Sequence, residues 1–407
     1  MTYRPSTELL ERYASILVHY GLANGAGIKP GETVQVRSSE DAKPLFFEVC
    51  KEIWRAGGNV IQTFMPADDA EHNFSAAFYE LASDAQLDHF SEPYYRGLLE
   101  QIDHIIFILG ERDPKALEGV DAAKISRHGR SQARSWEFRL PKERAGNLHW
   151  TIGMYGTEAQ AAEAGMTLEQ YWDQIIRACF LDDPDPVARW KQTAAEVRRY
   201  RDWLNSLAID RLHVEAEEID LWLTLGEQRR WISADGKNIP SFEVFTTPDW
   251  RGTNGRVRFS EPLYYQGSLI RGIELDFKDG EVVRAGADEN GELIQAMVRQ
   301  PGANRLGEYS LTDARSSRID RFMADTLYDE NMGGPFGNTH MALGIAITEA
   351  FDGDESAVSD AEWERLGFNV GAALHCDIVS TTDRTVTATL KDGSTRVVYE
   401  RGRFQTD

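Results

Sequence analysis

Residues 32–65 read ETVQVRSSEDAKPLFFEVCKEIWRAGGNVIQTFM, and this stretch decides the fold class of the first half of the chain. Its two ends, residues 32–38 and 59–65, have the apolar and β-branched composition of strands. Residues 45–58 between them have the periodicity of an amphipathic helix that two glycines end. A third strand candidate, DHIIFILGE, follows at residues 103–111. Because strand–helix–strand alternation with nearly continuous apolar strands is typical of parallel sheets, we predict an α/β fold with a largely parallel sheet.

From about residue 206 apolar and polar residues alternate, which is typical of antiparallel strands with one solvated face. Two Lys-Asp-Gly sequences, at residues 278–280 and 391–393, lie between such stretches and predict hairpin turns. Short helical patterns interrupt the strands at residues 291–303 and around residues 341–351. The sequence therefore predicts two domains, an N-terminal α/β domain at residues 1–205 and a mostly antiparallel β (α+β) domain at residues 206–407.

The composition is that of a globular protein with a large acidic excess. Of 407 residues, 42% are hydrophobic, and 44 Lys+Arg against 66 Asp+Glu give a net charge of −22. Such a charge disfavours nucleic acid and anionic membranes as partners. No apolar run approaches the roughly 18 residues that a membrane span needs, and three cysteines are too few for a disulfide framework. We therefore expect a cytoplasmic protein.

Four short segments of the second half carry residue types that suit a metal site. They are SFEVFTTPD with Glu243, GANRLGEYS with Glu308, TLYDENMGGPFGNTHMALG with Asp329, Glu330 and His340, and LHCDIVS with His375 and Asp377. Taken singly, a glutamate in a strand usually faces solvent, and a lone histidine usually has a structural partner. His375 and Asp377 are a stronger pair, because residues two apart share one face of a strand. Together these nitrogen and oxygen donors, without thiolate, suit zinc, cobalt, manganese or magnesium.

In this order and at these separations, the four segments resemble those of the thermophilic metallo-aminopeptidase family, which comprises aminopeptidase T and its relatives. The resemblance covers essentially the whole chain. It implies that two divalent metal ions are held, with Glu308 as the carboxylate shared between them. The implied metal ligands are Glu243, Glu308, His340, His375 and Asp377. It also implies a homodimer whose C-terminal domains meet and enclose the active sites.

The charges of this ligand set agree with a catalytic site. Two divalent ions carry four positive charges, which three carboxylates and one bridging hydroxide balance. Five protein ligands with one shared leave open positions for that hydroxide and for substrate. Cys376 lies between His375 and Asp377, so strand alternation points it away from the ligands, and we expect it to be a packing residue.

The function that the resemblance implies is a metal-dependent aminopeptidase, a hydrolase that removes N-terminal residues from peptides by attack of the hydroxide held between the ions. Glu330 is the candidate general base, because the TLYDEN segment supplies an acidic residue that is not needed as a ligand. A glutamate at the end of a helix explains it equally well. Relatives usually have a tyrosine at the position of Ile347, where it would help to stabilise the tetrahedral intermediate, and Tyr328 is the candidate substitute.

The segment Met332–Asn338 is an insertion relative to that family pattern. It combines three glycines and a proline with Phe336, and it lies between Glu330 and His340 in the chain. Two hypotheses follow: a lid or pocket wall in which Phe336 contacts the side chain of the substrate, or a surface bulge without contacts.

The alternative function is that of a different enzyme class on the same scaffold. Ring-cleaving dioxygenases of the dihydroxypyridine type resemble this family but hold one Fe(II) with two histidines and one carboxylate. His340, His375 and Asp377 would form that triad. The retention of Glu243 and Glu308 favours two ions and a hydrolase. A third hypothesis, a binding protein without activity, is disfavoured by the intact ligand set. The expected partners are a peptide or small-molecule substrate and a second copy of the chain.

Overall fold

The computed structural model describes residues 3–113, 115–265, 267–372 and 374–406. The chain forms two compact units. Unit 1 comprises Met1–Lys191 and Asp235–Pro240, and unit 2 comprises Gln192–Ala234 and Ser241–Asp407. Because compactness does not show that a unit folds by itself, the predicted domains at residues 1–205 and 206–407 stay a prediction.

Unit 1 holds most of the helices. They are α1 (Thr7–His19), η1 (Ala23–Gly25), α2 (Lys43–Arg55), α3 (Phe74–Leu81), α4 (Asp84–Leu87), α5 (Glu92–Gln101), α6 (Ala122–Ala133), α7 (Trp136–Arg144), α8 (Glu158–Glu163) and α9 (Leu168–Ala178). The long helix α10 (Pro186–Ser206) contains the residues at which unit 1 gives way to unit 2. Among the described residues, no helix is long and apolar enough to span a membrane.

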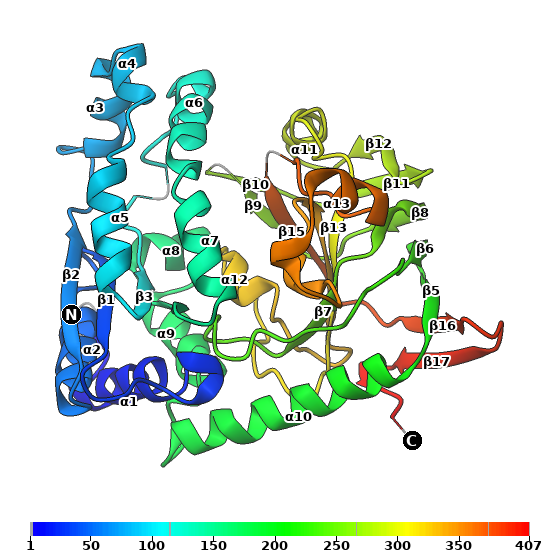
Figure 1. Ribbon diagram of the computed structural model, residues 1–407, viewed down its shortest axis with the longest axis horizontal. Coiled ribbons are helices and arrows are strands. Elements are labelled where there is room, and N and C mark those ends of the chain that lie inside the picture. The colour runs from blue at the N-terminus through cyan, green and yellow to red at the C-terminus, as the bar shows by residue number, and fades with distance from the viewer. Residues whose placement is uncertain (1–2, 114, 266, 373, 407) are drawn as a thin grey trace. The chain divides into compact units, whose positions relative to one another are not determined.

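The sheet of unit 1 is parallel throughout. Its strands are β1 (Thr33–Ser39), β2 (Asn59–Met65), β3 (His104–Leu109) and β4 (His149–Met154), in the order β2-β1-β3-β4. Strands β2, β1 and β3 are seen side by side in Figure 1. The chain passes from β1 to its neighbour β2 on one side and then crosses back to its neighbour β3 on the other side. The topological switch point therefore lies between β1 and β3.

Helices pack on both faces of this sheet, as the apolar strands predict. Val34 and Val36 of β1 are fully buried on one face, and Gly153, whose partner Ile108 belongs to that face, lies against Leu17 of α1. The other face carries a separate apolar cluster contributed by β3, α5, α7 and their neighbours, and its buried members are Leu99, Ile102, Ile105 and Leu148. The α/β prediction for the first half is confirmed.

Unit 2 contains an eight-stranded antiparallel sheet in the order β12-β11-β8-β6-β5-β16-β17-β18. Its strands are β5 (Ile209–Ala216), β6 (Ile219–Thr224), β8 (Asp249–Arg258), β11 (Glu274–Lys278), β12 (Glu281–Gly286), β16 (Thr385–Leu390), β17 (Thr395–Glu400) and β18 (Arg403–Phe404). Both predicted Lys-Asp-Gly turns join paired strands. In the first turn, Asp279 and Gly280 have positive φ angles of 50° and 88°, as a tight hairpin requires.

A second antiparallel sheet of four strands, in the order β15-β14-β13-β7, carries the predicted ligands. Its strands are β7 (Glu243–Thr246), β13 (Leu306–Thr312), β14 (Asn338–Gly344) and β15 (His375–Ser380). The remaining elements of this unit are the ribbon β9 (Leu263–Tyr265) and β10 (Ser268–Ile270), the helices α11 (Gly291–Val298), α12 (Thr326–Asp329) and α13 (Asp360–Leu366), and the 3-10 turns η2 (Thr348–Ala350) and η3 (Glu355–Ala357).

The helical pattern predicted around residues 341–351 is wrong for its first part. Met341–Gly344 end strand β14, and only residues 348–350 form a 3-10 turn. All residues of β14 are buried, so the strand lacks the polar alternation that would distinguish it from a buried helix. The helix predicted at residues 291–303 is confirmed over residues 291–298.

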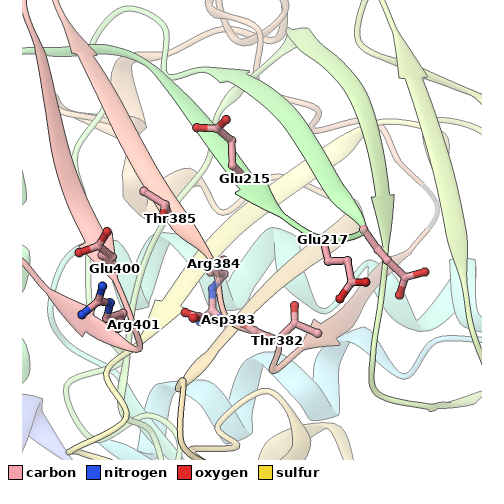
Figure 2. Close-up of a pocket in the computed structure, with 9 residues that line it drawn as sticks. Glu215, Glu217, Thr382, Asp383, Arg384, Thr385, Glu400 and Arg401 are labelled. Carbon is pink, nitrogen blue, oxygen red and sulfur yellow. Dashed lines mark hydrogen bonds between the residues drawn. The ribbon is translucent and has the colours of Figure 1, made fainter.

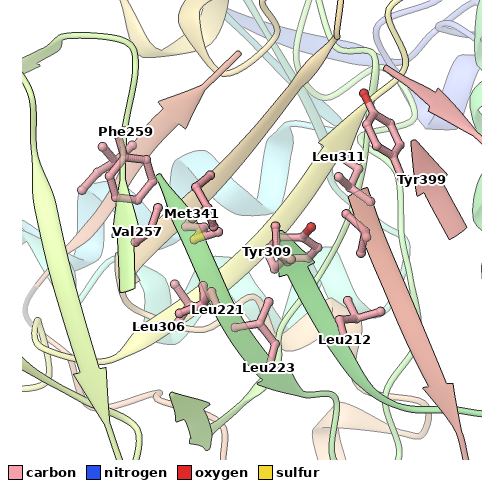
Figure 3. Close-up of a cluster of buried hydrophobic side chains, with 14 of the residues drawn as sticks. Leu212, Leu221, Leu223, Val257, Phe259, Leu306, Tyr309, Leu311, Met341 and Tyr399 are labelled. Atoms are coloured by element: carbon pink, nitrogen blue, oxygen red, sulfur yellow. The ribbon is translucent and has the colours of Figure 1, made fainter. Parts of the chain in front are cut away.

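The core of unit 2 lies between the two antiparallel sheets. Figure 3 shows Leu212, Leu221 and Leu223 of the large sheet among the same cluster as residues of the small sheet. The residues that the small sheet contributes alternate along its strands: Val244, Tyr309, Leu311, Met341, Leu343, Cys376 and Ile378. The prediction that Cys376 is a packing residue is confirmed. Because side chains alternate between faces, the residues between these project from the opposite face.

A β-bulge adjusts this alternation in β13. Leu306 pairs with Leu343 and Glu308 with Ala342, so Gly307 is an extra residue in the ladder. The bulge lets Leu306 enter the core while Glu308 faces the other way. A Cβ atom at residue 307 would lie 2.3 Å from the carbonyl oxygen of Ile345, so the close approach of the backbones requires glycine.

Candidate metal centre

All five predicted ligands project from the face of the small sheet that is turned away from the core. Glu243 begins β7, Glu308 lies in β13, His340 in β14, and His375 and Asp377 in β15. The sequence separations between them are large, but the order β15-β14-β13-β7 places their strands side by side. Unit 2 alone therefore assembles the complete set.

The ligand atoms form two groups that share one carboxylate. Glu243, Glu308 and His340 are the inner group, and Glu308, His375 and Asp377 are the outer group; within each, the possible ligand atoms lie within 4.8 Å of one another. The Nε2 atom of His340 is 3.2 Å from Oε1 of Glu308, and the Nε2 atom of His375 is 3.2 Å from Oε2. Glu308 therefore presents one oxygen to each group, the geometry expected of a bridging carboxylate.

Backbone carbonyls fix the orientation of both imidazole rings. The Nδ1 atom of His340 is 3.1 Å from the carbonyl oxygen of Glu330, and that of His375 is 2.8 Å from the carbonyl oxygen of Ile345. A carbonyl only accepts hydrogen bonds, so in each ring Nδ1 carries the hydrogen and donates it. Both rings consequently direct Nε2 toward the carboxylates, an arrangement common behind metal-binding histidines.

Two serines hold the carboxylate of Glu243. Ser241 donates a hydrogen bond of 3.1 Å to Oε1, and Ser310 donates one of 3.2 Å to Oε2. The sequence interpretation did not single out these serines, because a serine acquires this role only when the strand pairing is known. The signal available in the sequence was that each serine lies two residues from a glutamate, Ser241 before Glu243 and Ser310 after Glu308.

Burial and charge act against each other in this cluster. Burial raises the pKa of Glu243 despite its hydrogen bond with His340. Burial also acts to lower the pKa of His340, but hydrogen bonds and charge from Glu243 and Glu308 outweigh it and raise that pKa well above its ordinary value. The pKa of His375 is raised in the same way by Asp377 and Glu308. Protons thus provide the positive charge that the carboxylates require when no cation is bound.

The residues fit divalent cations. Oδ1 of Asp377 is buried and has no hydrogen-bond partner among the described residues, although it lies 3.4 Å from Nε2 of His375. Burial of three carboxylates beside two imidazoles leaves an excess of negative charge, which is costly unless a cation neutralises it. Mixed carboxylate and imidazole donors are those that zinc, manganese and similar ions accept.

Comparison with known proteins agrees with this geometry. A family profile described as thermophilic metalloprotease (M29) matches residues 6–404. The chain belongs to the M29 metalloprotease family. Relatives include aminopeptidase PepS of Streptococcus thermophilus, 27% identical, and aminopeptidase 2 of Geobacillus stearothermophilus, 28% identical, each over 97% of both chains. Aminopeptidase T of Thermus aquaticus is 26% identical over 98% of both chains.

Solved structures show the same relationship. Wild-type AmpT from Thermus thermophilus superposes with a TM-score of 0.80 and 25% identity, over 98% of this chain and 99% of that one. The 2,5-dihydroxypyridine dioxygenase of Pseudomonas putida KT2440 has a TM-score of 0.52 at 12% identity, over 98% of both chains, which shows a shared fold only. The predicted family, the fold class and the enzyme class of metallo-aminopeptidase are confirmed, and a metalloprotease implies a divalent metal.

In this M29 member, the predicted general base Glu330 lies directly after α12 and is buried. Burial raises its pKa, and the negative charges of Glu243 and Asp377 raise it further, so its carboxylate lies in the field of the ligand cluster. Its own carbonyl oxygen accepts the hydrogen bond from His340. Glu330 thus orients His340 through its carbonyl oxygen, and the role of its carboxylate as general base stays a prediction.

Asn331 is a contact of this centre that the sequence interpretation missed. Its Oδ1 accepts a hydrogen bond of 2.7 Å from the backbone N–H of Phe242, the residue before Glu243. Its Nδ2 lies 3.4 Å from Oε1 of Glu330 and 3.2 Å from the carbonyl oxygen of Leu327, and the side chain is fully buried. The amide therefore connects the turn that carries Glu330 to the strand that carries Glu243. The signal available in the sequence was that Asn331 is the last residue of the TLYDEN segment, directly after Glu330.

The side chain of Tyr328 is fully buried, and its backbone carbonyl accepts a hydrogen bond from Asn331 in the same turn as Glu330. The role predicted for its hydroxyl stays a prediction. Ile347, at the position of the family tyrosine, donates its backbone N–H to Thr247, whose hydroxyl in turn bonds to the carbonyl of Gly307. This residue contributes backbone bonding beside Glu308.

The insertion Met332–Asn338 is not a bulge without contacts. Asn338 donates a hydrogen bond of 2.5 Å to the carbonyl of Met332 and closes the loop, and Gly333 donates one of 2.8 Å to Ile319. Tyr399 of β17 donates one of 3.0 Å to the carbonyl of Phe336, whose backbone also lies against Gly402. These contacts hold Phe336 at the end of the large sheet, so the role in substrate contact stays a prediction.

Unit 2 also has a pocket of about 390 Å³ at the β5–β6 turn and the ends of β16 and β17 (Figure 2). No predicted ligand lines this pocket. Its lining is mostly acidic: Glu215, Glu217, Glu218, Asp383 and Glu400, with Arg384, Arg401 and two threonines. It is therefore a feature of the large sheet and not part of the metal centre.

Proposed function

We propose that this M29 member is an aminopeptidase whose inner and outer groups each hold one divalent ion, bridged by Glu308. The observation that carries the proposal is the division of the Glu308 carboxylate, with one oxygen 3.2 Å from each histidine. Divalent ions, when bound, would supply positive charge that polarises a peptide carbonyl and acidifies water. The ligands would be Glu243, Glu308 and His340 for one ion and Glu308, His375 and Asp377 for the other.

The charges support Glu330 as the proton acceptor. With Glu330 ionised, four carboxylates balance two divalent ions, so an uncharged water molecule completes a neutral centre. When Glu330 takes the proton of the attacking water, the total charge of the centre does not change. Glu330 would then return the proton to the leaving amine, which a carboxyl group of raised pKa does readily.

The exposure of the outer group supports its assignment as the place where substrate binds. The side chain of His375 is 27% exposed, whereas that of His340 is 1% exposed. A peptide would approach from the side of His375, and an ion held by Glu308, His375 and Asp377 would polarise its carbonyl group. The carboxylates would stabilise the charged α-amine of a peptide with a free N-terminus. A peptide with a blocked N-terminus lacks this charge and would gain no such stabilisation.

The test is an assay with aminoacyl-anilides in the presence of cobalt, zinc or manganese, together with metal analysis of the purified chain. We expect hydrolysis of free aminoacyl-anilides, none of the corresponding N-acetyl compounds, and two ions per chain, one for each ligand group. Equal hydrolysis of the N-acetyl compounds would contradict an aminopeptidase. One iron per chain with no hydrolysis would favour the dioxygenase alternative, which leaves Glu243 and Glu308 without a function.

The homodimer and the cytoplasmic location remain part of this proposal. Light scattering is expected to give twice the chain mass of 45.9 kDa. A stable monomer at micromolar concentration would contradict the dimer.

A further inference from the structure

Arg37 of unit 1 stands at the topological switch point of the parallel sheet. It lies in β1, two residues before the end of that strand, and its register partner on β3 is Phe107. Its guanidinium carbon is 5.3 Å from the centre of the Phe107 ring. In open parallel sheets, ligands bind outside the carboxyl ends of the strands at the switch point. Arg37 and Phe107 lie on the two strands that flank it, each two residues before the carboxyl end of its strand.

The guanidinium of Arg37 has no anionic partner. It forms no hydrogen bond or ion pair with any residue in the described ranges, and its Nε atom is buried. Other arginines of unit 1 differ: Arg139 pairs with Glu143, and Arg96 and Arg134 pair with Glu92. Burial lowers the pKa of Arg37; Tyr95 and Tyr94 act to raise it and Arg139 acts to lower it, and the net direction is downward. The surroundings of Arg37 therefore disfavour its charge, although the chain as a whole is acidic.

A second guanidinium adds to this positive region. That of Arg139 lies 5.6 Å from the same Phe107 ring, so two cations lie close to one aromatic ring. Because Glu143 compensates only Arg139, the pair of arginines retains one uncompensated positive charge. A guanidinium has five N–H donors in a planar fork that matches the two oxygens of a carboxylate or phosphate group. Arg37 is half-buried, and the burial of its Nε atom without an acceptor is costly.

We propose that Arg37 and Phe107 form an oxyanion-binding site, which takes a carboxylate or phosphate group on the guanidinium fork and an apolar portion of the ligand against the ring. The site belongs to unit 1 and is built from residues that play no part in the metal centre. Its ligand is defined by an oxyanion with two available oxygens, and its two possible sources are carboxylic acids and phosphate.

The test measures the thermal midpoint of the full chain with inorganic phosphate, acetate or chloride at matched ionic strength. The proteins are wild type, Arg37→Met, and Arg134→Met as the matched control, since Arg134 also lies over an aromatic ring but has Glu92 as its partner. Phosphate that binds to metal ions would shift the Tm equally in all three proteins, so the result is the difference in Tm shift between them. An oxyanion at about ten times its dissociation constant should raise the Tm of wild type and Arg134→Met by about 1–2 °C.

Arg37→Met should lose this response, and in the absence of oxyanions its Tm should equal or exceed that of wild type, because methionine removes an uncompensated charge. The stronger of the phosphate and acetate responses identifies the source of the ligand. An equal response to chloride, or an unchanged response in Arg37→Met, would overturn the proposal. Calorimetric titration of wild type with phosphate and acetate gives a check without a variant, since absence of saturable binding in the millimolar range would also overturn it.

Discussion

The inner and outer ligand groups share Glu308 but have different surroundings. Glu243 and His340 of the inner group are 4% and 1% exposed, and two serines hold the carboxylate of Glu243. The side chains of the outer group, His375 and Asp377, are 27% and 10% exposed. A closed ligand set with hydrogen-bonded carboxylates is typical of tight binding, and a set with an open side is typical of catalysis. We therefore expect a slowly exchanging inner ion and a readily exchanging outer ion.

The largest effect is expected from Glu308→Gln, which removes the charge that both groups share. Metal analysis should show loss of both ions, and turnover should fall to background while the fold survives. Glu364→Gln, on an exposed position of α13, is the matched control and should change neither quantity. Full metal content with near-normal turnover in Glu308→Gln would refute the bridging assignment.

His375→Ala should separate the two groups. It removes the exposed imidazole, so the outer ion should be lost and turnover should fall to background, whereas the inner ion should remain. His340→Ala should remove the inner ion and also release the carbonyl of Glu330 from its hydrogen bond. Metal content of both variants checks this, and equal loss of both ions in each variant would mean that the groups act as one.

Asn331→Asp tests how the inner side of the centre supports catalysis. Aspartate keeps the acceptor for the N–H of Phe242 but replaces the donor toward Glu330 with a negative oxygen. We expect kcat to fall about 100-fold, at the lower end of the range for a disturbed general base, with KM and metal content unchanged. Ser317→Ala, which removes the bond of 2.5 Å to the Asn331 carbonyl, is the control for a merely structural effect. Equal losses in both variants would assign Asn331 to structure alone.

Metal affinity should weaken as the pH falls. Their carboxylate neighbours raise the pKa values of His340 and His375 well above the ordinary value, so in the metal-free protein both rings keep their second proton to a higher pH than a free imidazole does. Each must release a proton before Nε2 binds a cation, which gives about a tenfold loss of affinity per pH unit and per histidine. Calorimetric titrations at several pH values measure this slope for each ion.

The stability of the metal-free protein should change in the opposite direction. A histidine whose folded pKa is raised stabilises the folded state fully below its unfolded pKa of about 6.5, and that stability is lost as the pH rises through the folded pKa. Chelated protein should therefore lose stability above pH ~6.5, as the two histidines deprotonate. A thermal midpoint that rises between neutral and alkaline pH after chelation would contradict the raised pKa values of His340 and His375.

The smallest effect is expected from Ser310→Ala. It removes one hydrogen bond to Glu243 without removing a ligand, so the inner ion should bind up to about 10-fold more weakly and the outer ion unchanged. Competition with a chelator measures both affinities. A loss confined to the outer ion would reverse the comparison between the two groups.

The sequence predicted the parallel sheet well because short strand candidates alternate with helices of clear periodicity along the first half of the chain. It predicted the ligand set only through the resemblance, since Glu243 and Asp377 lie more than a hundred residues apart and only the pairing of four strands brings them together. Strand β14 was mistaken in part for a helix because burial on both faces erases its alternation. Asn331 and the two serines could not be assigned from sequence, since their hydrogen-bond partners are defined by that same pairing.

The β-bulge at Gly307 bears on which mutations the enzyme tolerates. The carbonyl of Ile345, which a Cβ atom at residue 307 would approach to 2.3 Å, is the same carbonyl that holds Nδ1 of His375. Replacing this glycine with alanine adds a single methyl group, yet that group can be accommodated only by moving the support of the outer histidine. Gly307 has no functional group, yet few other residues can replace it without disturbing the active site. Natural variation at residue 307 should therefore be as restricted as at the ligands themselves.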